Sequence, residues 1–223
     1  FPYTTLFRSL PGIGFIIYLF CGRGIDGQEV FKLSDDEKQM VQRIKEKVDI
    51  DNKKAGRDKR YDLLYDAKVL NRYFRNMDAS PLAKRNSLQL FTDGQEKFQA
   101  LFEDIRAAKE TVHVEYYAFF NDTIGNQFLD VLIEKLHEGV EVYLIYDPWG
   151  SPGANKKFFA RYVDAGGKVA PFITSRDMIR KTRLNYHLHR KIVVIDGKIG
   201  WTGGFNVGDQ YLNVTEKFGY WRD

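Results

Sequence analysis

Cysteine is nearly absent from this chain of 223 residues, which contains Cys21 and no other. A single cysteine excludes an internal disulfide and is typical of proteins from a reducing compartment. Cys21 lies in an apolar stretch near the N-terminus, so we do not expect it to be a catalytic thiol. The fold must therefore depend on a hydrophobic core, for which a hydrophobic content of 43% is ample.

A strong excess of one charge is also lacking. The chain has 34 basic and 30 acidic residues, for a net charge of +4. This mild balance gives little support to a polyanionic partner, and no nucleic acid is expected. The 223 residues contain no internal repeat and no low-complexity tract, so they can form one large or two small ordinary domains.

A hydrophobic run long enough to cross a membrane is missing too, although Leu10–Cys21 is mostly apolar. A spanning helix needs about 20 apolar residues, so this run is too short alone. It fits a buried helix, a signal-peptide core, or the C-terminal part of a transmembrane helix cut by truncation. We favour the last and assign residues 10–22 to it, with Arg23 and the basic segment beyond on the cytoplasmic side. Residues 1–9 read like a translated sequencing adapter, and we exclude them from the fold.

Residues 23–86 are predicted to be a cytoplasmic linker that contains helices. A capping-box pattern at residues 34–37, ahead of an apolar stripe, predicts a helix over residues 35–48. The charged run 51–60 indicates a loop, and the apolar residues between 63 and 74 indicate a second helix.

From residue 87 to residue 223 the pattern alternates between strands and helices. Apolar or alternating runs predict short strands at residues 87–91, 111–119, 140–146, 169–173 and 192–195. Amphipathic runs between them predict helices around residues 98–105, 128–136 and 156–164. Repeated β-α-β units predict an α/β fold with a mixed sheet flanked by helices on both faces.

Chemistry-bearing residues concentrate at the end of this segment. His189, Lys191 and Asp196 are spaced H-x-K-x4-D, and Gly203-Gly204 and Asn206 follow. On extended backbone, His189 and Lys191 leave the same face of the chain. The two glycines permit a tight turn that brings backbone N–H groups and the Asn206 amide toward the same point. A nucleophile, a cation and neutral donors in one small volume are what a phosphate ester requires.

Asp196 is not expected to be catalytic. It follows the apolar strand 192–195, which places it at the far end of that strand from His189. Asp196-Gly197 is a strong hairpin-turn signal. We therefore interpret Asp196, like Gly203 and Gly204, as a structural residue of the motif.

Other polar residues near the motif are candidates for substrate binding. Glu115 lies in a predicted strand, where it is either a surface residue or part of a cleft at the end of the sheet. Basic residues cluster ahead of the motif, and they form either a solvated loop or a field that attracts an anionic substrate: Arg176, Arg180, Lys181, Arg183 and Arg190.

His187 shares a face with His189 if the strand begins early, and a histidine pair raises the question of a zinc site. No cysteine or third ligand lies at metal-site spacing, and Lys191 would repel a cation. We therefore predict no metal and no other cofactor, and we retain His187 as a candidate substrate-binding residue.

The motif from His189 to Asn206 resembles the HKD motif of the phospholipase D superfamily. Neighbouring words resemble the bacterial cardiolipin synthases of the phospholipase D type across about residues 10–223: Val-Glu-Tyr-Tyr (114–117), Ala-Gly-Gly-Lys-Val-Ala-Pro-Phe (165–172), Leu-Asn-Tyr (184–186) and Phe-Gly-Tyr-Trp-Arg-Asp (218–223). The match is dense after Ser87 and thinner before it.

The resemblance implies a catalytic unit built from two facing HKD halves. The first histidine, here His189, attacks phosphorus, while Lys191 and Asn206 take the charge and Asp223 holds the second imidazole nitrogen. The donor and the acceptor would both be phosphatidylglycerol, with glycerol leaving, at the cytoplasmic side of the bacterial cell membrane.

One H-x-K-x4-D motif occurs in the sequence, so we expect residues 87–223 to be the first half of such an enzyme and to be inactive alone. The alternatives are another phosphodiesterase of the superfamily, a phospholipase or a nuclease, or a non-catalytic domain that binds anionic lipid.

Overall fold

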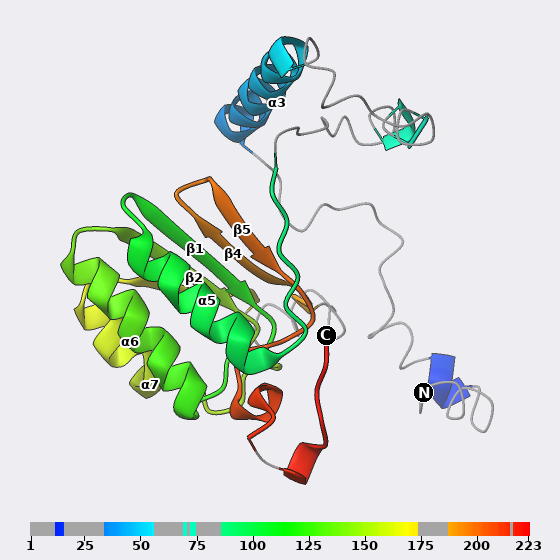
Figure 1. The fold of residues 1–223 in the computed structure, drawn as a ribbon. Coiled ribbons are helices and arrows are strands. Elements are labelled where there is room, and N and C mark those ends of the chain that lie inside the picture. The colour runs from blue at the N-terminus through cyan, green and yellow to red at the C-terminus, as the bar shows by residue number, and fades with distance from the viewer. Residues whose placement is uncertain are drawn as a thin grey trace. The chain divides into compact units, whose positions relative to one another are not determined.

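The structure, a computed structural model, describes residues 12–15, 34–55, 69–70, 72–74, 86–173, 187–214 and 216–223 (Figure 1). The chain divides into two units, one of Asp26–Leu90 and one of Phe91–Asp223 together with Phe1–Ile25. The motif from His189 to Asn206 belongs to the second unit.

The first unit contains the helix α3 (Asp35–Ala55). Its capping box is formed, because the backbone N–H of Ser34 donates to Glu37 Oε2 at 2.6 Å and the N–H of Glu37 donates to Ser34 Oγ at 3.3 Å. The predicted helix is confirmed, but the loop predicted from residue 51 is wrong as far as Ala55. Lys53, Lys54 and Ala55 are good helix formers, and no glycine interrupts the helix before them.

Two further predictions concern the end of this unit. Of the second predicted helix, residues 69–70 and 72–74 are described and are helical, and the rest lies outside the described residues. The strand predicted at residues 87–91 is wrong, because these residues join no β-ladder. Leu88 and Leu90 are 96% and 80% exposed, so these apolar side chains do not pack against a core. Without such packing the alternating pattern does not produce a strand.

The second unit is built on a five-stranded mixed sheet with the order β3-β2-β1-β4-β5. The strands are β1 (Thr111–Tyr116), β2 (Glu141–Tyr146), β3 (Lys168–Pro171), β4 (Lys191–Ile195) and β5 (Ile199–Thr202). β1, β2 and β3 run parallel, whereas β4 is antiparallel to both β1 and β5. The predicted α/β class and mixed sheet are confirmed.

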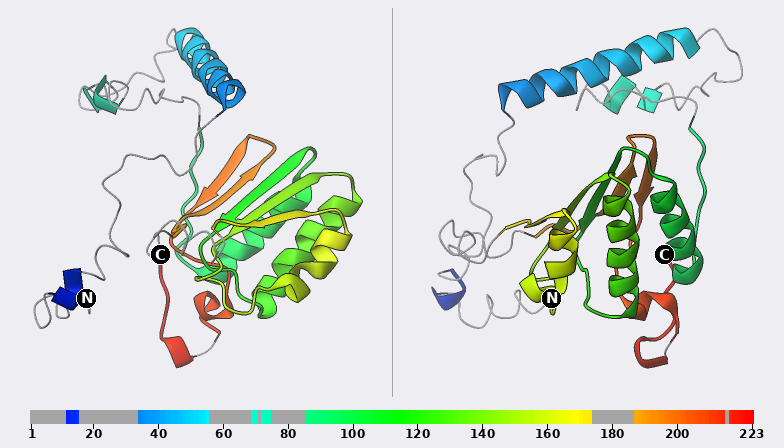
Figure 2. Two further views of the ribbon diagram at one scale, coloured as in Figure 1. Left: turned by 180° about the vertical axis from the view of Figure 1, so that it is seen from behind. Right: turned by 90° about the vertical axis from the view of Figure 1, so that its left-hand side faces the viewer.

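Three helices lie together on one face of this sheet: α5 (Gly94–Ala107), α6 (Thr123–His137) and α7 (Lys156–Asp164) (Figure 2). The expected second layer of helices is not present among the described residues. The reason is topological, because β1, β2 and β3 follow one another in the same direction across the sheet. Right-handed crossovers that step the same way deposit α6 and α7 on the same face.

The core fills the space between these helices and the sheet. A cluster of phenylalanines comes from α5, α6 and the segment after β1, with the rings of Phe98, Phe102 and Phe119 packed around Phe128 at centroid distances of 5.4–6.4 Å. Val112, Val114 and Tyr116 cover it from β1, each at most 3% exposed. Alternate residues of β1 point to the opposite face, as the pattern of the sequence predicts.

The motif residues and Asp196 lie at opposite ends of the strands. Because β4 is antiparallel to β1, its first residue, Lys191, pairs with Tyr116 at the carboxyl end of β1. We call this end of the sheet the motif end. At the opposite end, which we call the Asp196 end, Asp196 and Gly197 form the β4–β5 turn with φ angles of 50° and 61°. Positive φ at both positions is typical of a type I′ turn, so the predicted hairpin is confirmed.

None of the described helices is long and apolar enough to cross a membrane. Of the apolar segment 10–22, residues 12–15 are described and are helical. Residues 1–9 lie outside the described part of the chain.

Candidate active site

His189 and Lys191 meet at the motif end of the sheet, as their spacing of two residues predicts. The Lys191 amino nitrogen lies 3.5 Å from each ring nitrogen of His189. Lys191 is only 7% exposed, whereas His189 is exposed. Burial lowers the pKa of Lys191, and the nearby negative charge of Asp223 partly opposes this shift. A buried cation thus stands directly behind an accessible imidazole.

The ring of Tyr117 contacts both His189 and Lys191. Its ring centroid lies 4.7 Å from that of His189, and the Lys191 amino group is 5.4 Å from the same ring. The Tyr117 N–H donates to the carbonyl of Arg190 at 3.0 Å, which extends the β1–β4 ladder past the ends of the strands. Backbone pairing of Lys191 with Tyr116 and of Arg190 with Tyr117 therefore fixes the position of the chain that carries the His189 imidazole.

The turn after β5 supplies backbone donors. The N–H groups of Gly204 and Phe205, the amide pair, both donate to one carboxylate oxygen of Asp223, the second at 3.0 Å. A Cβ atom at Gly204 would collide with this carboxylate where it now lies, so the absence of a side chain permits the close approach. The amide pair therefore forms an anion-binding concavity.

This placement of Asp223 differs from the expected contact with His189. In the described part of the chain the ring nitrogens of His189 have Lys191 as their polar neighbour, while Asp223 binds the amide pair. The physical reason is that the two converging N–H groups leave a position that a carboxylate oxygen satisfies. A phosphate oxygen has the same acceptor chemistry as this carboxylate oxygen, since both carry delocalised negative charge.

Asn206 is 8% exposed, and its side chain connects the turn after β5 to the chain that follows β1. Its Oδ1 accepts the Ala118 N–H at 3.1 Å, and its Nδ2 donates to the Tyr211 hydroxyl at 2.8 Å. Tyr211 belongs to the short helix η2 (Asp209–Leu212), which Asp209 ties to the first turn of α6. Nδ2 has two hydrogens, and one of them has a partner among the described residues.

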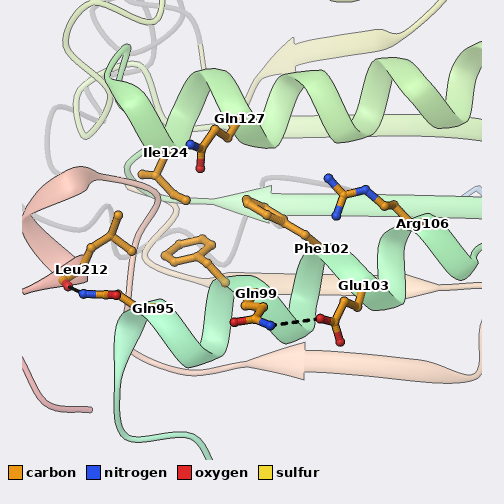
Figure 3. Close-up of a pocket in the computed structure, with 9 residues that line it drawn as sticks. Gln95, Gln99, Phe102, Glu103, Arg106, Ile124, Gln127 and Leu212 are labelled. Carbon is orange, nitrogen blue, oxygen red and sulfur yellow. Dashed lines mark hydrogen bonds between the residues drawn. The ribbon is translucent and has the colours of Figure 1, made fainter.

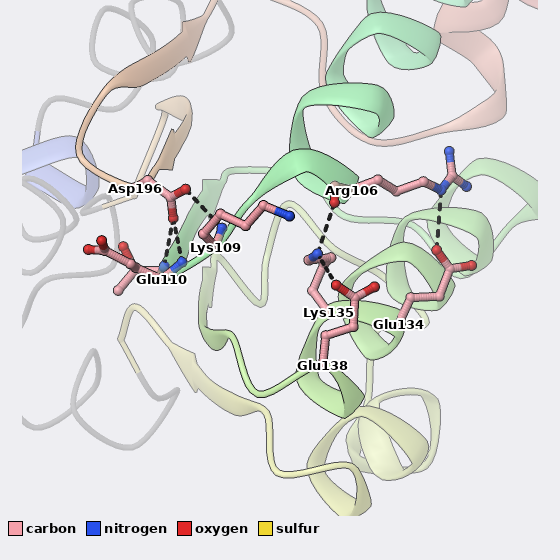
Figure 4. Close-up of polar contacts among 8 residues, drawn as sticks. Arg106, Lys109, Glu110, Glu134, Lys135, Glu138 and Asp196 are labelled. Carbon is pink, nitrogen blue, oxygen red and sulfur yellow. Dashed lines mark hydrogen bonds and ion pairs between the residues drawn. The ribbon is translucent and has the colours of Figure 1, made fainter.

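Asp196 lies at the opposite end and caps the start of β1 (Figure 4). Its carboxylate accepts the N–H groups of Lys109, Glu110 and Thr111 at 2.9, 2.8 and 2.9 Å. These three hydrogen bonds lower the pKa of Asp196 below its ordinary value. The prediction that Asp196 is a turn and structural residue agrees with this geometry.

Asp147 is a residue that the sequence interpretation missed. It follows β2, is 2% exposed, and its Oδ2 accepts the Leu188 N–H at 2.9 Å. The same oxygen lies 3.4 Å from His187 Nδ1, while Oδ1 accepts the Trp149 N–H at 2.9 Å. Asp147 therefore fixes the segment that leads into His189. A polar residue at the carboxyl end of a parallel strand, followed by Gly150-Ser151, was the available signal.

The remaining candidates have different positions. His187 Nδ1 is buried near Asp147 but makes no hydrogen bond with the described residues, and the ring stands edge-on to Tyr117 and Trp149, with centroid distances of 6.3 and 5.9 Å. Glu115 is half-buried on the sheet face away from the helices, paired with Ile192. Arg190 is exposed. Arg183 lies outside the described residues.

A cavity of about 360 Å³ opens elsewhere, between α5, α6 and η2 (Figure 3). Phe98, Phe102 and Leu212 line it together with polar side chains, and Gln99 and Glu103 bond to each other at 3.2 Å. None of its lining residues belongs to the motif. Among the residues that the structure describes, no group of three His, Cys, Asp or Glu side chains is placed to hold a metal ion.

Comparison with known proteins gives three findings. The family model "Cardiolipin synthase, PLD-like domain" matches residues 101–217. A cardiolipin synthase of Listeria monocytogenes serotype 4b is 40% identical over 225 residues, covering 96% of this chain and 44% of the relative. A cardiolipin synthase of Staphylococcus aureus strain Mu50 is also 40% identical, covering 96% of this chain and 43% of the relative.

Among solved structures, NucT from Helicobacter pylori is similar at 21% identity with a TM-score of 0.43, over 57% of this chain and 79% of that one. The chain spans less than half the length of the two cardiolipin synthases described above. The family match covers more than half of the chain and contains His189, Lys191 and Asn206. The chain therefore belongs to the cardiolipin synthase family with a phospholipase D-like domain.

Proposed function

We propose that this chain is the first catalytic half of a phosphatidyltransferase that makes cardiolipin from phosphatidylglycerol. The observation that carries the proposal is the contact between His189 and Lys191 at 3.5 Å. An accessible imidazole next to a buried ammonium group, with an anion-binding amide pair nearby, fits attack on a phosphodiester.

The first half-reaction forms a phosphohistidine. A neutral ring nitrogen of His189 attacks phosphorus, and the bond between phosphorus and the oxygen of the glycerol headgroup breaks. Glycerol leaves with a proton, and the phosphatidyl group stays on His189. Lys191, the amide pair and the side-chain amide of Asn206 stabilise the negative charge that spreads over the phosphoryl oxygens in the transition state.

The second half-reaction transfers the phosphatidyl group. A hydroxyl of a second phosphatidylglycerol attacks phosphorus and loses its proton, and the phosphorus–nitrogen bond breaks. The products are cardiolipin and free His189. A second motif supplies the acid and base for these protons, because the 223 residues hold a single H-x-K-x4-D.

Asp223 has a conditional role in this scheme. Its carboxylate and a phosphate oxygen compete for the same amide pair. When phosphate binds there, Asp223 is displaced and becomes available to hold the second nitrogen of His189, as a carboxylate does in other histidine-dependent sites.

The proposal extends to the organisation of the chain. We assign residues 87–223 to the first catalytic half, 23–86 to a linker and 10–22 to the end of a membrane helix, with residues 1–9 as a sequencing artefact. The catalytic half then works at the cytoplasmic surface of the bacterial membrane, where its lipid substrate lies.

The test uses a full-length enzyme that contains this chain, incubated with phosphatidylglycerol carrying a labelled phosphate. Labelled cardiolipin with release of free glycerol supports the proposal. Phosphatidic acid as the main product would indicate a phospholipase instead. Failure to turn over any phospholipid, with hydrolysis of DNA, would replace the proposal with a nuclease.

A further inference from the structure

Lys97 of α5 is a half-buried cation. Its amino group donates to the Tyr116 hydroxyl at 2.9 Å and lies 3.7 Å from the centroid of the Phe98 ring. No carboxylate forms an ion pair with it in the part of the chain that the structure describes. An ammonium group has three hydrogens to donate, and a buried one is costly when they lack acceptors.

Lys135 shows how this fold treats a lysine that is only structural. It is 1% exposed, and its amino group donates to the Arg106 carbonyl at 2.8 Å and to the Glu138 carboxylate (Figure 4). Its charge is thus neutralised locally. Lys97 lacks such a carboxylate among the described residues, so its charge is not neutralised by an ion pair there.

The position of Lys97 places it at the motif end. Its partner Tyr116 is the cross-strand neighbour of Lys191, and both side chains point toward the helices. The negative charge of Asp223 raises the pKa of Lys97 and that of Lys191, against the effect of burial. One carboxylate therefore lies within electrostatic reach of both ammonium groups while it binds the amide pair.

We propose that Lys97 is a second anion-binding cation of this site, which binds a phosphoryl oxygen together with Lys191 and the amide pair. Tyr116 is its positioning residue, since the hydroxyl holds the amino group in place. The ligand class is a phosphate ester or a free phosphate. The inference rests on the proposed function for the identity of the lipid, but not for the binding of phosphate.

The protonation of Lys97 supports this assignment. Burial lowers its pKa to about 7, and Asp223 opposes the shift. The amino group contacts the hydroxyl of Tyr116 from β1, and the charge of Asp223 in the C-terminal segment acts on it. A phosphate dianion carries more charge than a carboxylate, so its arrival raises the pKa of Lys97 and draws a proton onto it above pH 7.

The experiment is calorimetric titration of this chain with inorganic phosphate at pH 8, in two buffers that differ in ionisation enthalpy. We expect binding with proton uptake in the wild type. Lys97→Met should weaken the affinity about tenfold, the loss of one charge-assisted hydrogen bond, and reduce the proton uptake. Tyr116→Phe keeps the charge but frees the amino group, so it should weaken binding less.

Lys168→Met is the matched control. Lys168 also donates to a tyrosine hydroxyl, that of Tyr143 at 3.0 Å, but on the exposed edge strand β3. Its affinity and proton uptake should equal those of the wild type, and thermal melts check that each variant is folded. Absence of phosphate binding in the wild type would overturn the inference, and so would a folded Lys97→Met with unchanged affinity and proton uptake. If Lys97→Met does not fold, the test depends on Tyr116→Phe. Unchanged phosphate affinity and proton uptake in folded Tyr116→Phe would then overturn the inference.

These outcomes are separate from the proposed function. Phosphate binding requires no chemical step, so it is measured whether or not the full-length enzyme forms cardiolipin. Failure to form cardiolipin would refute the proposed lipid substrate and leave the role of Lys97 in anion binding intact.

Discussion

The charged groups at the two ends of the sheet differ in whether they have partners of opposite charge or polarity. At the Asp196 end, the carboxylate of Asp196 accepts three backbone N–H groups, and the buried Lys135 has both a carbonyl and a carboxylate partner. At the motif end, Lys191 is buried and Lys97 is half-buried, and neither has an ion-pair carboxylate among the described residues.

This difference separates structural from functional polar groups. A charge whose partners are built into the fold is neutralised there and has nothing left for a ligand. A cation held away from solvent without a carboxylate is costly, and such strain is retained where a ligand neutralises it. In the proposed function the motif end receives an anion, whereas Asp196 and Lys135 at the other end already have their partners.

The largest expected effect follows from removing the nucleophile. In the full-length enzyme, His189→Ala should reduce turnover of phosphatidylglycerol to background, because no phosphohistidine can form. Product analysis by thin-layer chromatography measures this. Because His189 is exposed at the end of the sheet, the variant should fold like the wild type, and substantial activity in it would reject the mechanism.

The next effect comes from Lys191. Lys191→Ala should lower kcat by roughly 100-fold, or about 3 kcal/mol, which is typical of losing one transition-state donor. Lys168→Ala is the control, since Lys168 is exposed and remote from the motif. Equal rates in the two variants would remove Lys191 from the charge-stabilising role.

Asp196 should affect stability rather than chemistry. Asp196→Ala removes the acceptor for three backbone N–H groups, so the melting temperature should fall by several degrees. Its pKa is lowered in the folded state, so its stabilisation is present above the unfolded pKa and is lost as pH falls through the folded value. The variant should lose this acid-dependent part of the stability.

The activity of the folded fraction provides the check on Asp196. In the full-length enzyme, kcat per folded molecule should stay near the wild-type value, because the carboxylate lies at the far end of β4. A large loss of kcat with an unchanged melting temperature would contradict the structural role.

The smallest expected effect is a change in how stability depends on pH. The pKa of Lys97 is lowered to about 7 in the folded chain, so the unfolded state binds more protons between that pH and the ordinary value of 10.5. Stability from this group therefore rises with pH across that window. Lys97→Met should flatten this rise, measured as the difference in unfolding free energy from the wild type. An unchanged slope would mean that Lys97 is ordinarily protonated.

Much of the second unit was predictable because local patterns agree with the fold. Phe98, Leu101, Phe102 and Ile105 recur at helical spacing and all lie in the core. The spacing of His189 and Lys191 was sufficient to place them together, since a strand alternates its side chains. The Asp196-Gly197 turn was readable because few residue pairs adopt positive φ twice in succession.

The failures involve contacts between distant residues. Leu88 and Leu90 alternate like a strand, but pairing depends on a partner that the local sequence cannot specify. Asp147 accepts a hydrogen bond from Leu188, which is 41 residues away in the sequence. Lys97 donates a hydrogen bond to Tyr116, but the amphipathic pattern of its helix predicts only which residues face the core. The partner of Asp223 was missed because the amide pair that binds it is created by a turn.

The account is tested most directly by locating the covalent intermediate. The full-length enzyme is mixed with phosphatidylglycerol labelled in its phosphate, quenched in base to preserve an acid-labile phosphohistidine, digested and mapped by mass spectrometry. The label is predicted on His189, within milliseconds to seconds of mixing and before cardiolipin accumulates. Label on another residue, or cardiolipin formed at full rate with no labelled His189 under any quench time, would contradict the assignment of the motif end as the catalytic centre.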